Sequence, residues 1–200
     1  HRDEVKLDNR SIRNLLQGKR VLITGAGGSI GSELVTQCLN FSPAEIICLD
    51  INEENIYKLE QTCGRVNSKV VMKTVLASVN SIEECEKVFL ENQPQIVFHA
   101  AAYKHVPIQE LHPWAAVNTN IGGTLNMVML SDKYKIDKFV LVSTDKAVNP
   151  ANIMGASKRI AENLLQSFNP ESNTTFIAVR FGNVLGSSGS AIPTFQRQIN

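Results

Sequence analysis

The chain has 200 residues, of which 43% are hydrophobic, and its formal net charge is +1. This length suits one domain with a packed core, and the near-neutral charge argues against nucleic acid or an anionic membrane surface as a partner. No apolar run approaches the ~20 residues of a membrane span. The cysteines have no C-x-x-C spacing and are typical of reduced thiols in a cytoplasmic protein. They are Cys38, Cys48, Cys63 and Cys85.

The first 18 residues are charged and differ from the rest of the chain. Ile12, Leu15 and Leu16 recur at helical spacing, and Gly18 comes next as a helix-ending residue. We therefore expect residues 1–18 to form a short leader helix packed on the outside of the fold. Residues 19–200 would form the main domain.

A β-branched run, residues 21–24, ends in a cluster of glycines and is followed at once by an amphipathic pattern. This order predicts a buried strand, a tight turn and a helix. The glycines have the spacing G-x-x-G-x-x-G, and side chains there would keep a diphosphate from the backbone and the helix from the strand. The helix start adds amides and a dipole that attract an anion. The residues expected to hold the diphosphate are Gly25, Gly28, Ser29, Ile30 and Gly31.

A second strand pattern, residues 44–50, ends in Asp50. An acid at this distance from a glycine turn can accept hydrogen bonds from an adenosine ribose. Because a 2′-phosphate would meet a like charge beside Asp50, the sequence favours NAD over NADP. The alternative is a plain strand–helix turn with a surface aspartate.

The rest of the chain alternates between strand and helix patterns. This alternation predicts an α/β fold with a doubly wound parallel sheet, strand order 3-2-1-4-5-6, and ligands at the carboxyl ends of the strands. The pattern stops after a sixth strand, so we expect a C-terminal substrate lobe to be missing. The remaining predicted strands are 69–75, 96–102, 139–144 and 175–180. The remaining predicted helices are 53–62, 113–130, 156–168 and 192–199, together with a helix that begins at a capping box at Ser81. In the helix at 156–168, we expect one face to carry Ile160, Leu164 and Leu165.

Small and polar residues come after the fourth strand. Residues 100–102 are alanines, which would let a flat cofactor lie against the backbone. His99, just before them, is more typical of a hydrogen-bonded core histidine than of a catalytic one. His105 and His112 have no further ligand at zinc spacing, so no metal site is predicted.

Residues 143–146, Ser-Thr-Asp-Lys, end the fifth strand and begin the next turn. Eight residues past Lys146 comes Met154, and Lys158 lies four residues further, on the same helix face, toward the expected cofactor edge. Taken alone, Asp145 and Lys146 would be a surface ion pair. Their place at the carboxyl end of a strand favours a functional role instead.

These motifs resemble the extended short-chain dehydrogenase/reductases. The resemblance is carried by Thr24-Gly25-x-x-Gly28-x-x-Gly31, the alanines at 100–102, and Asn120-Ile121-Gly122-Gly123-Thr124. Within that superfamily, residues 143–150 and 180–187 resemble the polysaccharide-biosynthesis, CapD-like UDP-N-acetylglucosamine 4,6-dehydratases. The resemblance covers nearly the whole chain from Leu7 onward and implies that residues 19–200 form a Rossmann domain.

The resemblance implies an enzyme that converts UDP-N-acetylglucosamine into a 4-keto-6-deoxy sugar nucleotide with NAD, in surface polysaccharide biosynthesis. Hydride would leave sugar C4 and later return to C6. Lys146 would remove the C5 proton, Asp145 would protonate the departing C6 hydroxyl, and Thr144 would hydrogen-bond the C4 oxygen. Lys158 would hold the nicotinamide ribose.

The resemblance also assigns site residues and partners. The catalytic set is Thr144, Asp145, Lys146, Met154 and Lys158. Besides the glycine turn, the cofactor set is Asp50, Ser78, Val79, Ala100, Ala101, Ala102 and Lys158. The substrate set is Lys104, His105, Asn120, Ser143, Asn183 and Val184. A homo-oligomer would pair through the helices near 118–130 and 156–168, and any membrane attachment would lie in sequence outside this chain.

The sequence departs from the superfamily pattern at Met154 and at Ser78-Val79. Met154 replaces the usual tyrosine and cannot exchange a proton, which argues against the second interpretation, a nucleotide-sugar 4-epimerase. A non-catalytic NAD-binding domain is the third interpretation of the chain. Ser78-Val79 stands where relatives often have Asp-Val at the adenine. Finally, Lys146 must be neutral to act as a base, so we expect burial and nearby positive charge to lower its pKa by about 3 from ~10.4.

Overall fold

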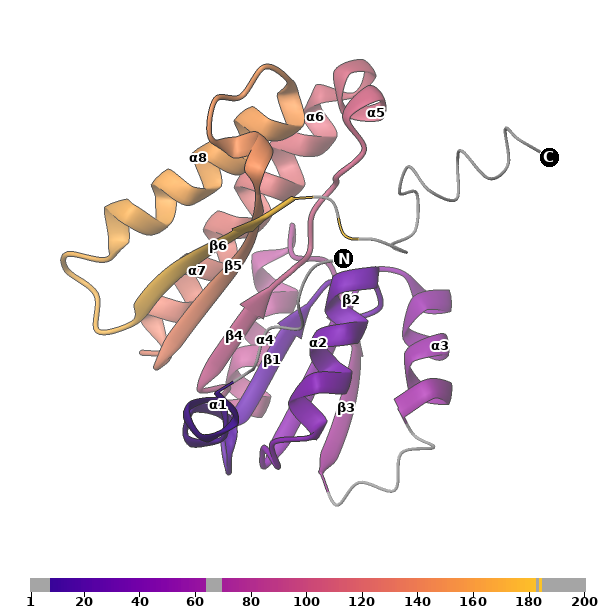
Figure 1. Cartoon of the computed structure of the whole chain (residues 1–200), viewed down its shortest axis with the longest axis vertical. Coiled ribbons are helices and arrows are strands. Elements are labelled where there is room, and N and C mark those ends of the chain that lie inside the picture. Colours follow the sequence, from indigo (N-terminus) through magenta and orange to yellow (C-terminus); the bar gives the residue numbers. More distant parts are fainter. Residues whose placement is uncertain (1–7, 64–69, 183, 185–200) are drawn as a thin grey trace.

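A six-stranded parallel sheet forms the centre of the protein in the computed structural model, which describes residues 8–63, 70–182 and 184 (Figure 1). The strand order is β3-β2-β1-β4-β5-β6, and each neighbouring pair is parallel. Both the predicted fold class and the predicted strand order are confirmed. The strands are β1 (Arg20–Thr24), β2 (Glu45–Asp50), β3 (Val71–Leu76), β4 (Ile96–His99), β5 (Lys138–Thr144) and β6 (Thr175–Phe181).

Helices cover both faces of the sheet. The helices α1 (Asn9–Leu16), α2 (Ser29–Leu39) and α3 (Glu53–Cys63) lie on one face (Figure 1). The helices α4 (Ile82–Asn92), α7 (Thr124–Lys133) and α8 (Ile153–Phe168) lie on the other. Two short helices, α5 (Val106–Leu111) and α6 (Pro113–Ala116), a π-helical segment η1 (Val117–Gly123) and a 3-10 turn η2 (Asp145–Ala147) complete the described elements. None of the helices in the described ranges is long and apolar enough to cross a bilayer.

The central strands bury both of their faces, as a parallel sheet between two helix layers requires. Leu22 and Ile47 belong to the core beneath α4, α7 and α8, while Val21 and Ile46 belong to the core beneath α1, α2 and α3. All four side chains are fully buried. Each such side chain stabilises the fold by about 1.5–3 kcal/mol, so the carboxyl edge of the sheet is a rigid platform.

The leader helix packs as the apolar spacing predicts. Leu16 is buried in the second core, and Ile12 and Leu15 pack against it. The side chain of Asp8 accepts hydrogen bonds from the first turn, and Gly18 lies just past the helix with a φ of +70°. Residues 1–7 and the predicted helix at 192–199 lie outside the described residues.

Three predicted details of the helices were wrong. The capping box at Ser81 is only half formed, because the side chain of Ser81 caps the Glu84 amide while the Glu84 carboxylate accepts the Ser78 N–H. The helix predicted at 113–130 is interrupted by the π segment η1. Helix α8 starts three residues earlier than predicted, where Asn152 caps it.

The predicted apolar face of α8 was also wrong. Ile160 is 44% exposed, whereas Leu165 is buried. The helix is rotated so that Met154, Lys158 and Glu162 face inward at a spacing of four residues. Two of these are polar, so the hydrophobic pattern alone does not show the rotation.

Candidate functional site

The turn after β1 needs glycine at two positions. Gly25 has a φ of +64°, and a Cβ there would lie 2.7 Å from the backbone of Ala101. A Cβ at Gly31 would lie 2.0 Å from the carbonyl oxygen of Gly25. Glycine therefore lets α2 and the loop after β4 close around the turn, and α2 begins without a side-chain cap. A helix start of this kind favours an anion such as a diphosphate.

Asp50 lies at the carboxyl end of β2, where the sequence places it, and it is buried. Its Oδ2 accepts the Gly27 N–H at 2.9 Å, and its Oδ1 accepts the Asn52 N–H at 2.9 Å. The carboxylate thus fixes both the glycine turn and the start of the next loop. Each oxygen keeps a second lone pair that a ribose hydroxyl could use.

A cavity of about 270 Å³ brings most of the predicted cofactor residues together. Polar residues that the sequence reasoning missed also line it, namely Asn52, Asn55, Asn80, Tyr103 and Thr119. These residues follow β2, β3 and β4 in the sequence or lie on η1 beside the loops after them. That position is the signal by which the sequence could have identified them. The predicted cofactor residues in its lining are Gly25, Gly28, Asp50, Ser78, Val79, Ala100, Ala101 and Ala102. The cavity has the shape and donors of a dinucleotide half-site.

The wall formed by Ser78 is fixed by local hydrogen bonds. Its N–H donates to Glu84 at 2.8 Å, and its Oγ accepts the Asn80 N–H at 3.2 Å. Asn80 in turn donates to Thr119 on η1. A ligand in this cavity would therefore meet a preformed wall at Ser78.

Asn120, a predicted substrate residue, has a structural role in the described chain. Its side chain is fully buried, accepts the Tyr103 N–H at 2.8 Å, and donates to the Tyr103 carbonyl and the Ser157 hydroxyl. Both amide protons and one of the two lone pairs of Oδ1 are used. Asn120 therefore ties the loop after β4 to α8, and its contact with a substrate stays a prediction.

His99 is the core histidine that the sequence indicates. It is fully buried, with Nδ1 2.7 Å from Thr24 Oγ1 and Nε2 3.1 Å from Thr124 Oγ1. Burial, with a further contribution from the positive charge of Lys158, lowers its pKa to about 3. His99 is therefore a neutral link between β1, β4 and α7 at physiological pH.

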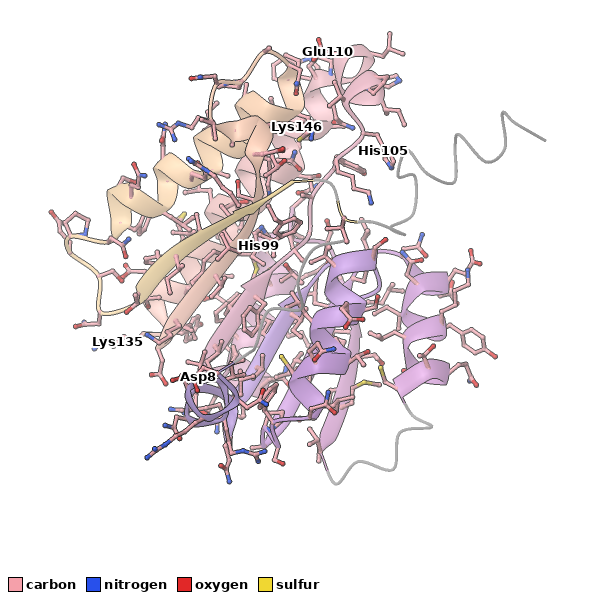
Figure 2. All side chains as sticks on the ribbon, in the orientation of Figure 1. Asp8, His99, His105, Glu110, Lys135 and Lys146 are labelled. Atoms are coloured by element: carbon pink, nitrogen blue, oxygen red, sulfur yellow. The ribbon has the colours of Figure 1, made fainter. Side chains whose placement is uncertain are left out.

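The Thr144–Asp145–Lys146 turn sits directly after β5 and is more open than predicted. The Thr144 hydroxyl donates to Asp145 Oδ1 at 3.0 Å, and Lys146 Nζ lies 3.2 Å from the same oxygen. Hydrogen bonds from Thr144 and then Lys146 hold the pKa of Asp145 below its usual range. The Lys146 side chain is 38% exposed, so the burial expected for it is not observed. Figure 2 shows Lys146 and His105 beyond the carboxyl ends of β5 and β4.

The desolvated lysine of the site is Lys158 instead. It is 5% exposed, and burial lowers its pKa to about 8 although Glu162 acts in the opposite direction. Met154 is buried one turn earlier on the same face of α8. Among the residues that the structure describes, Lys158 has no hydrogen-bond or ion-pair partner. A buried ammonium in this position calls for a polar ligand.

Helix α8 approaches the catalytic turn through a glycine. A Cβ at Gly155 would lie 2.5 Å from the Lys146 carbonyl oxygen. The Ile153 N–H donates to Glu110 of α5 at 2.7 Å, which fixes the start of the helix. The chain therefore holds the two candidate lysines on elements that pack directly together.

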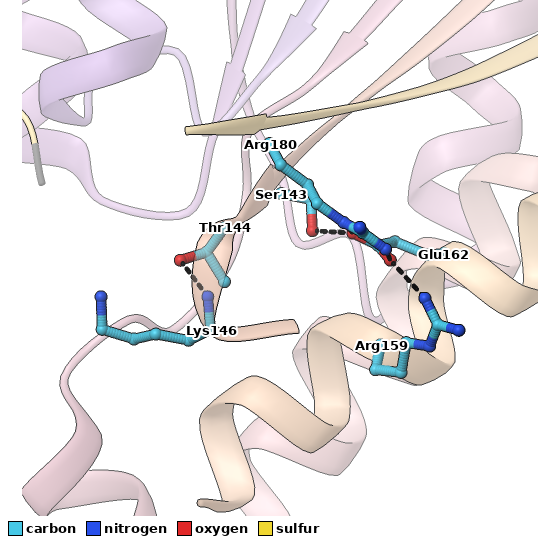
Figure 3. A network of polar contacts seen from close by, with 6 residues as sticks. All are labelled: Ser143, Thr144, Lys146, Arg159, Glu162 and Arg180. Atoms are coloured by element: carbon cyan, nitrogen blue, oxygen red, sulfur yellow. Dashed lines mark hydrogen bonds and ion pairs between the residues drawn. The ribbon is translucent and has the colours of Figure 1, made fainter. Parts of the chain in front are cut away.

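Ser143, which is predicted to contact the substrate, lies in a polar network centred on Glu162. Its hydroxyl is buried and donates to Glu162 at 2.6 Å (Figure 3). Arg180 of β6 also binds Glu162, and the sequence reasoning named neither of these two as a site residue. Of the other predicted substrate residues, Lys104 and His105 are exposed before α5, Val184 is 40% exposed, and Asn183 lies outside the described residues. No cluster of metal-ligating side chains occurs within the described ranges.

Comparison with known proteins decides the family. Residues 21–200 match the family model described as "Polysaccharide biosynthesis protein". The chain belongs to this family. It is 48% identical over 200 residues to the capsular polysaccharide biosynthesis protein CapD of Staphylococcus aureus, a match that covers 99% of this chain and 33% of the relative. It is 32% identical to the inverting UDP-N-acetylglucosamine 4,6-dehydratase of Campylobacter jejuni, over 92% of this chain and 55% of the relative.

Solved structures agree with this placement in the extended short-chain dehydrogenase/reductases. The X-ray structure of Pen from Bacillus thuringiensis has a TM-score of 0.85 at 36% identity, over 92% of this chain and 56% of that one. A Thermus thermophilus UDP-glucose 4-epimerase complex with NAD has a TM-score of 0.69 at 25% identity, over 80% and 54%. The chain thus spans from a third to a little over half the length of these proteins.

Proposed function

We propose that the chain carries the cofactor domain of an NAD-dependent UDP-N-acetylglucosamine 4,6-dehydratase in surface polysaccharide biosynthesis. One observation carries the proposal. An acid and an amine, Asp145 and Lys146, share the turn at the carboxyl end of β5, and Met154 occupies the place of the proton-exchanging tyrosine. The similarity to a dehydratase of Campylobacter jejuni supports this assignment.

The cavity beside the glycine turn is where NAD would bind. The uncapped start of α2 would hold the diphosphate, Asp50 would accept from the adenosine ribose, and the alanines at 100–102 would lie against the nicotinamide half. Lys158 would donate to the nicotinamide ribose, which gives its buried ammonium a partner. When bound there, NAD would supply a temporary acceptor for the hydride of sugar C4.

The resting ion pair can become the reactive pair by moving one proton. Lys146 Nζ lies 3.2 Å from Asp145 Oδ1. Transfer of a proton from the ammonium to the carboxylate leaves a neutral amine, which can take the C5 proton. It also leaves a carboxylic acid, which can protonate the leaving C6 oxygen. A sugar bound against this turn would displace part of the water around both charges and favour the neutral pair, because burying two charges is costly.

Product analysis of the full-length protein with UDP-N-acetylglucosamine and NAD tests the proposal. We expect a 4-keto-6-deoxy sugar nucleotide, identified by mass and by NMR. Formation of the 4-epimer would instead support the second candidate, which is favoured by the 25% identity to a 4-epimerase that binds NAD. Binding of NAD without turnover would identify a non-catalytic NAD-binding protein.

We further propose that the protein pairs with a second copy through α7 and α8. Met129 and Ile160 are large apolar residues that remain 45% and 44% exposed on these helices. Trp114 on α6, which precedes η1 and α7 in the chain, is also exposed. Light scattering of the full-length protein would show a dimer, and a monomer at all concentrations would contradict the pairing.

A further inference from the structure

Glu162 is the buried centre of a polar network that joins three elements (Figure 3). Its side chain is 2% exposed on α8. Oε1 accepts Ser143 Oγ at 2.6 Å and Arg180 Nε at 2.8 Å. Oε2 accepts Arg180 Nη2 at 2.5 Å and Arg159 Nη1 at 3.5 Å. Four donors therefore surround one carboxylate, and two of them come from the fork of Arg180.

Lys158 lies four residues before Glu162 on the same face of the same helix. An acid and a base at this spacing ordinarily attract and pair on a helix. Both side chains are buried here, which strengthens the attraction. Even so, no hydrogen bond or ion pair joins them in the described structure, because both oxygens of Glu162 are engaged by Arg180 and its neighbours.

Competition between Lys158 and Arg180 for one carboxylate explains why Lys158 has no hydrogen-bond or ion-pair partner among the described side chains. We propose that Arg180 is a positioning residue that holds the Glu162 carboxylate away from Lys158, so that the Lys158 ammonium remains available to the nicotinamide ribose. This inference rests on the proposed role of Lys158 in binding NAD. It gives β6 a part in cofactor binding although no side chain of β6 lines the described cavity.

The effect of Arg180 on Lys158 must be distinguished from the effects of other charged groups near α8. Within the described ranges, Glu162 and His99 are the groups that interact electrostatically with Lys158, and His99 is neutral above about pH 3. The charged side chains on the remaining elements packed against α8 are Glu110, Asp132, Lys133, Lys138, Asp145, Lys146 and Arg180. Of the side chains on these neighbouring elements, the test variants change only Arg180.

The test uses the full-length protein with lysine Cε labelled with carbon-13, and Lys158→Met assigns the signal. In Arg180→Met, Glu162 is released toward Lys158. We expect the Lys158 titration to move to higher pH and NAD binding, measured by calorimetry, to weaken about tenfold or more, as loss of a charge-assisted hydrogen bond does. Adding Glu162→Gln in the same chain should restore NAD binding and return the titration to the parent's midpoint or below it.

Arg159→Met is the matched control, because Arg159 makes only the 3.5 Å contact to the same carboxylate. It should change neither readout. If Arg180→Met does not fold, Arg180→Lys keeps the charge but loses the fork and should give smaller changes in the same direction. A lower melting temperature with an unmoved Lys158 titration would show a purely structural role and overturn the inference. So would failure of the double variant to restore NAD binding. Absence of a 4-keto product in a protein that passes these tests would refute only the proposed dehydratase activity.

Discussion

At the scale of single residues, the site separates two lysines by their surroundings. Lys146 is partly exposed and paired with Asp145, whereas Lys158 is buried and unpaired among the described side chains. Burial disfavours the charged form of Lys158, and its pKa falls to about 8. The partly exposed lysine is therefore suited to exchange protons with substrate and solvent, and the buried one to hold a fixed ligand.

His99 gives a stability prediction of its own. Its pKa falls to about 3 because it is buried, so between that value and the ordinary value of ~6.5 the unfolded chain binds the proton and the folded chain does not. The contribution of neutral His99 to the free energy of unfolding is complete above pH 6.5. It is lost as the pH falls toward 3, by about 1.4 kcal/mol for each pH unit. Thermal unfolding between pH 7 and 4 should show a shallower decline for His99→Gln than for the parent. Parallel curves would contradict the account.

At the scale of elements, the β1 turn and α2 form one unit because their backbones touch. A methyl group at Gly31 would meet the Gly25 carbonyl at 2.0 Å, and backbone on both sides cannot give way cheaply. The same close contact between Gly25 and Gly31 directs the first turn of α2 toward the cavity. Stability and cofactor affinity should therefore change together at this position.

Gly31→Ala should lower the free energy of unfolding by about 1–3 kcal/mol, as overpacking does, and weaken NAD binding. Gly122→Ala is the control, because its Cβ would meet nothing nearer than 3.8 Å. We expect the control to stay within about 1 kcal/mol of the parent. Urea unfolding and calorimetry measure the two effects. Equal behaviour of the two variants would refute the close-packing argument.

At the scale of the whole molecule, the sequence predicts the sheet and the cofactor side well because their signals are local. Apolar runs and the glycine spacing each lie within a few residues of one another, and Asp50 ends the next strand at the distance that a strand–helix–strand unit sets. The network of Ser143, Glu162 and Arg180 could not be predicted in this way. It joins residues 18 and 19 positions apart, and it depends on the rotation of α8 and the register of β5 with β6.

The same limit explains the errors at Ile160 and Lys146. Hydrophobic spacing placed Ile160 inward, but Lys158 and Glu162 take the inward stripe of α8 because the buried site holds them there. Burial of Lys146 was inferred from the chemistry it would need. Exposure depends on what packs over the turn, which no spacing in the chain specifies.

The central claim is that Asp145 and Lys146 together move protons at C5 and C6 of a hexose held beside NAD. The most direct measurement is turnover of UDP-N-acetylglucosamine by the full-length protein in D₂O, with Lys146→Met and Asp145→Asn alongside. Because Lys146 is open to solvent, it can exchange the C5 proton, so the parent should give a 4-keto-6-deoxy product with deuterium at C5. Each variant should turn over UDP-N-acetylglucosamine at least about 100-fold more slowly than the parent. A product without deuterium at C5, or either variant at the parent's rate, would contradict the account.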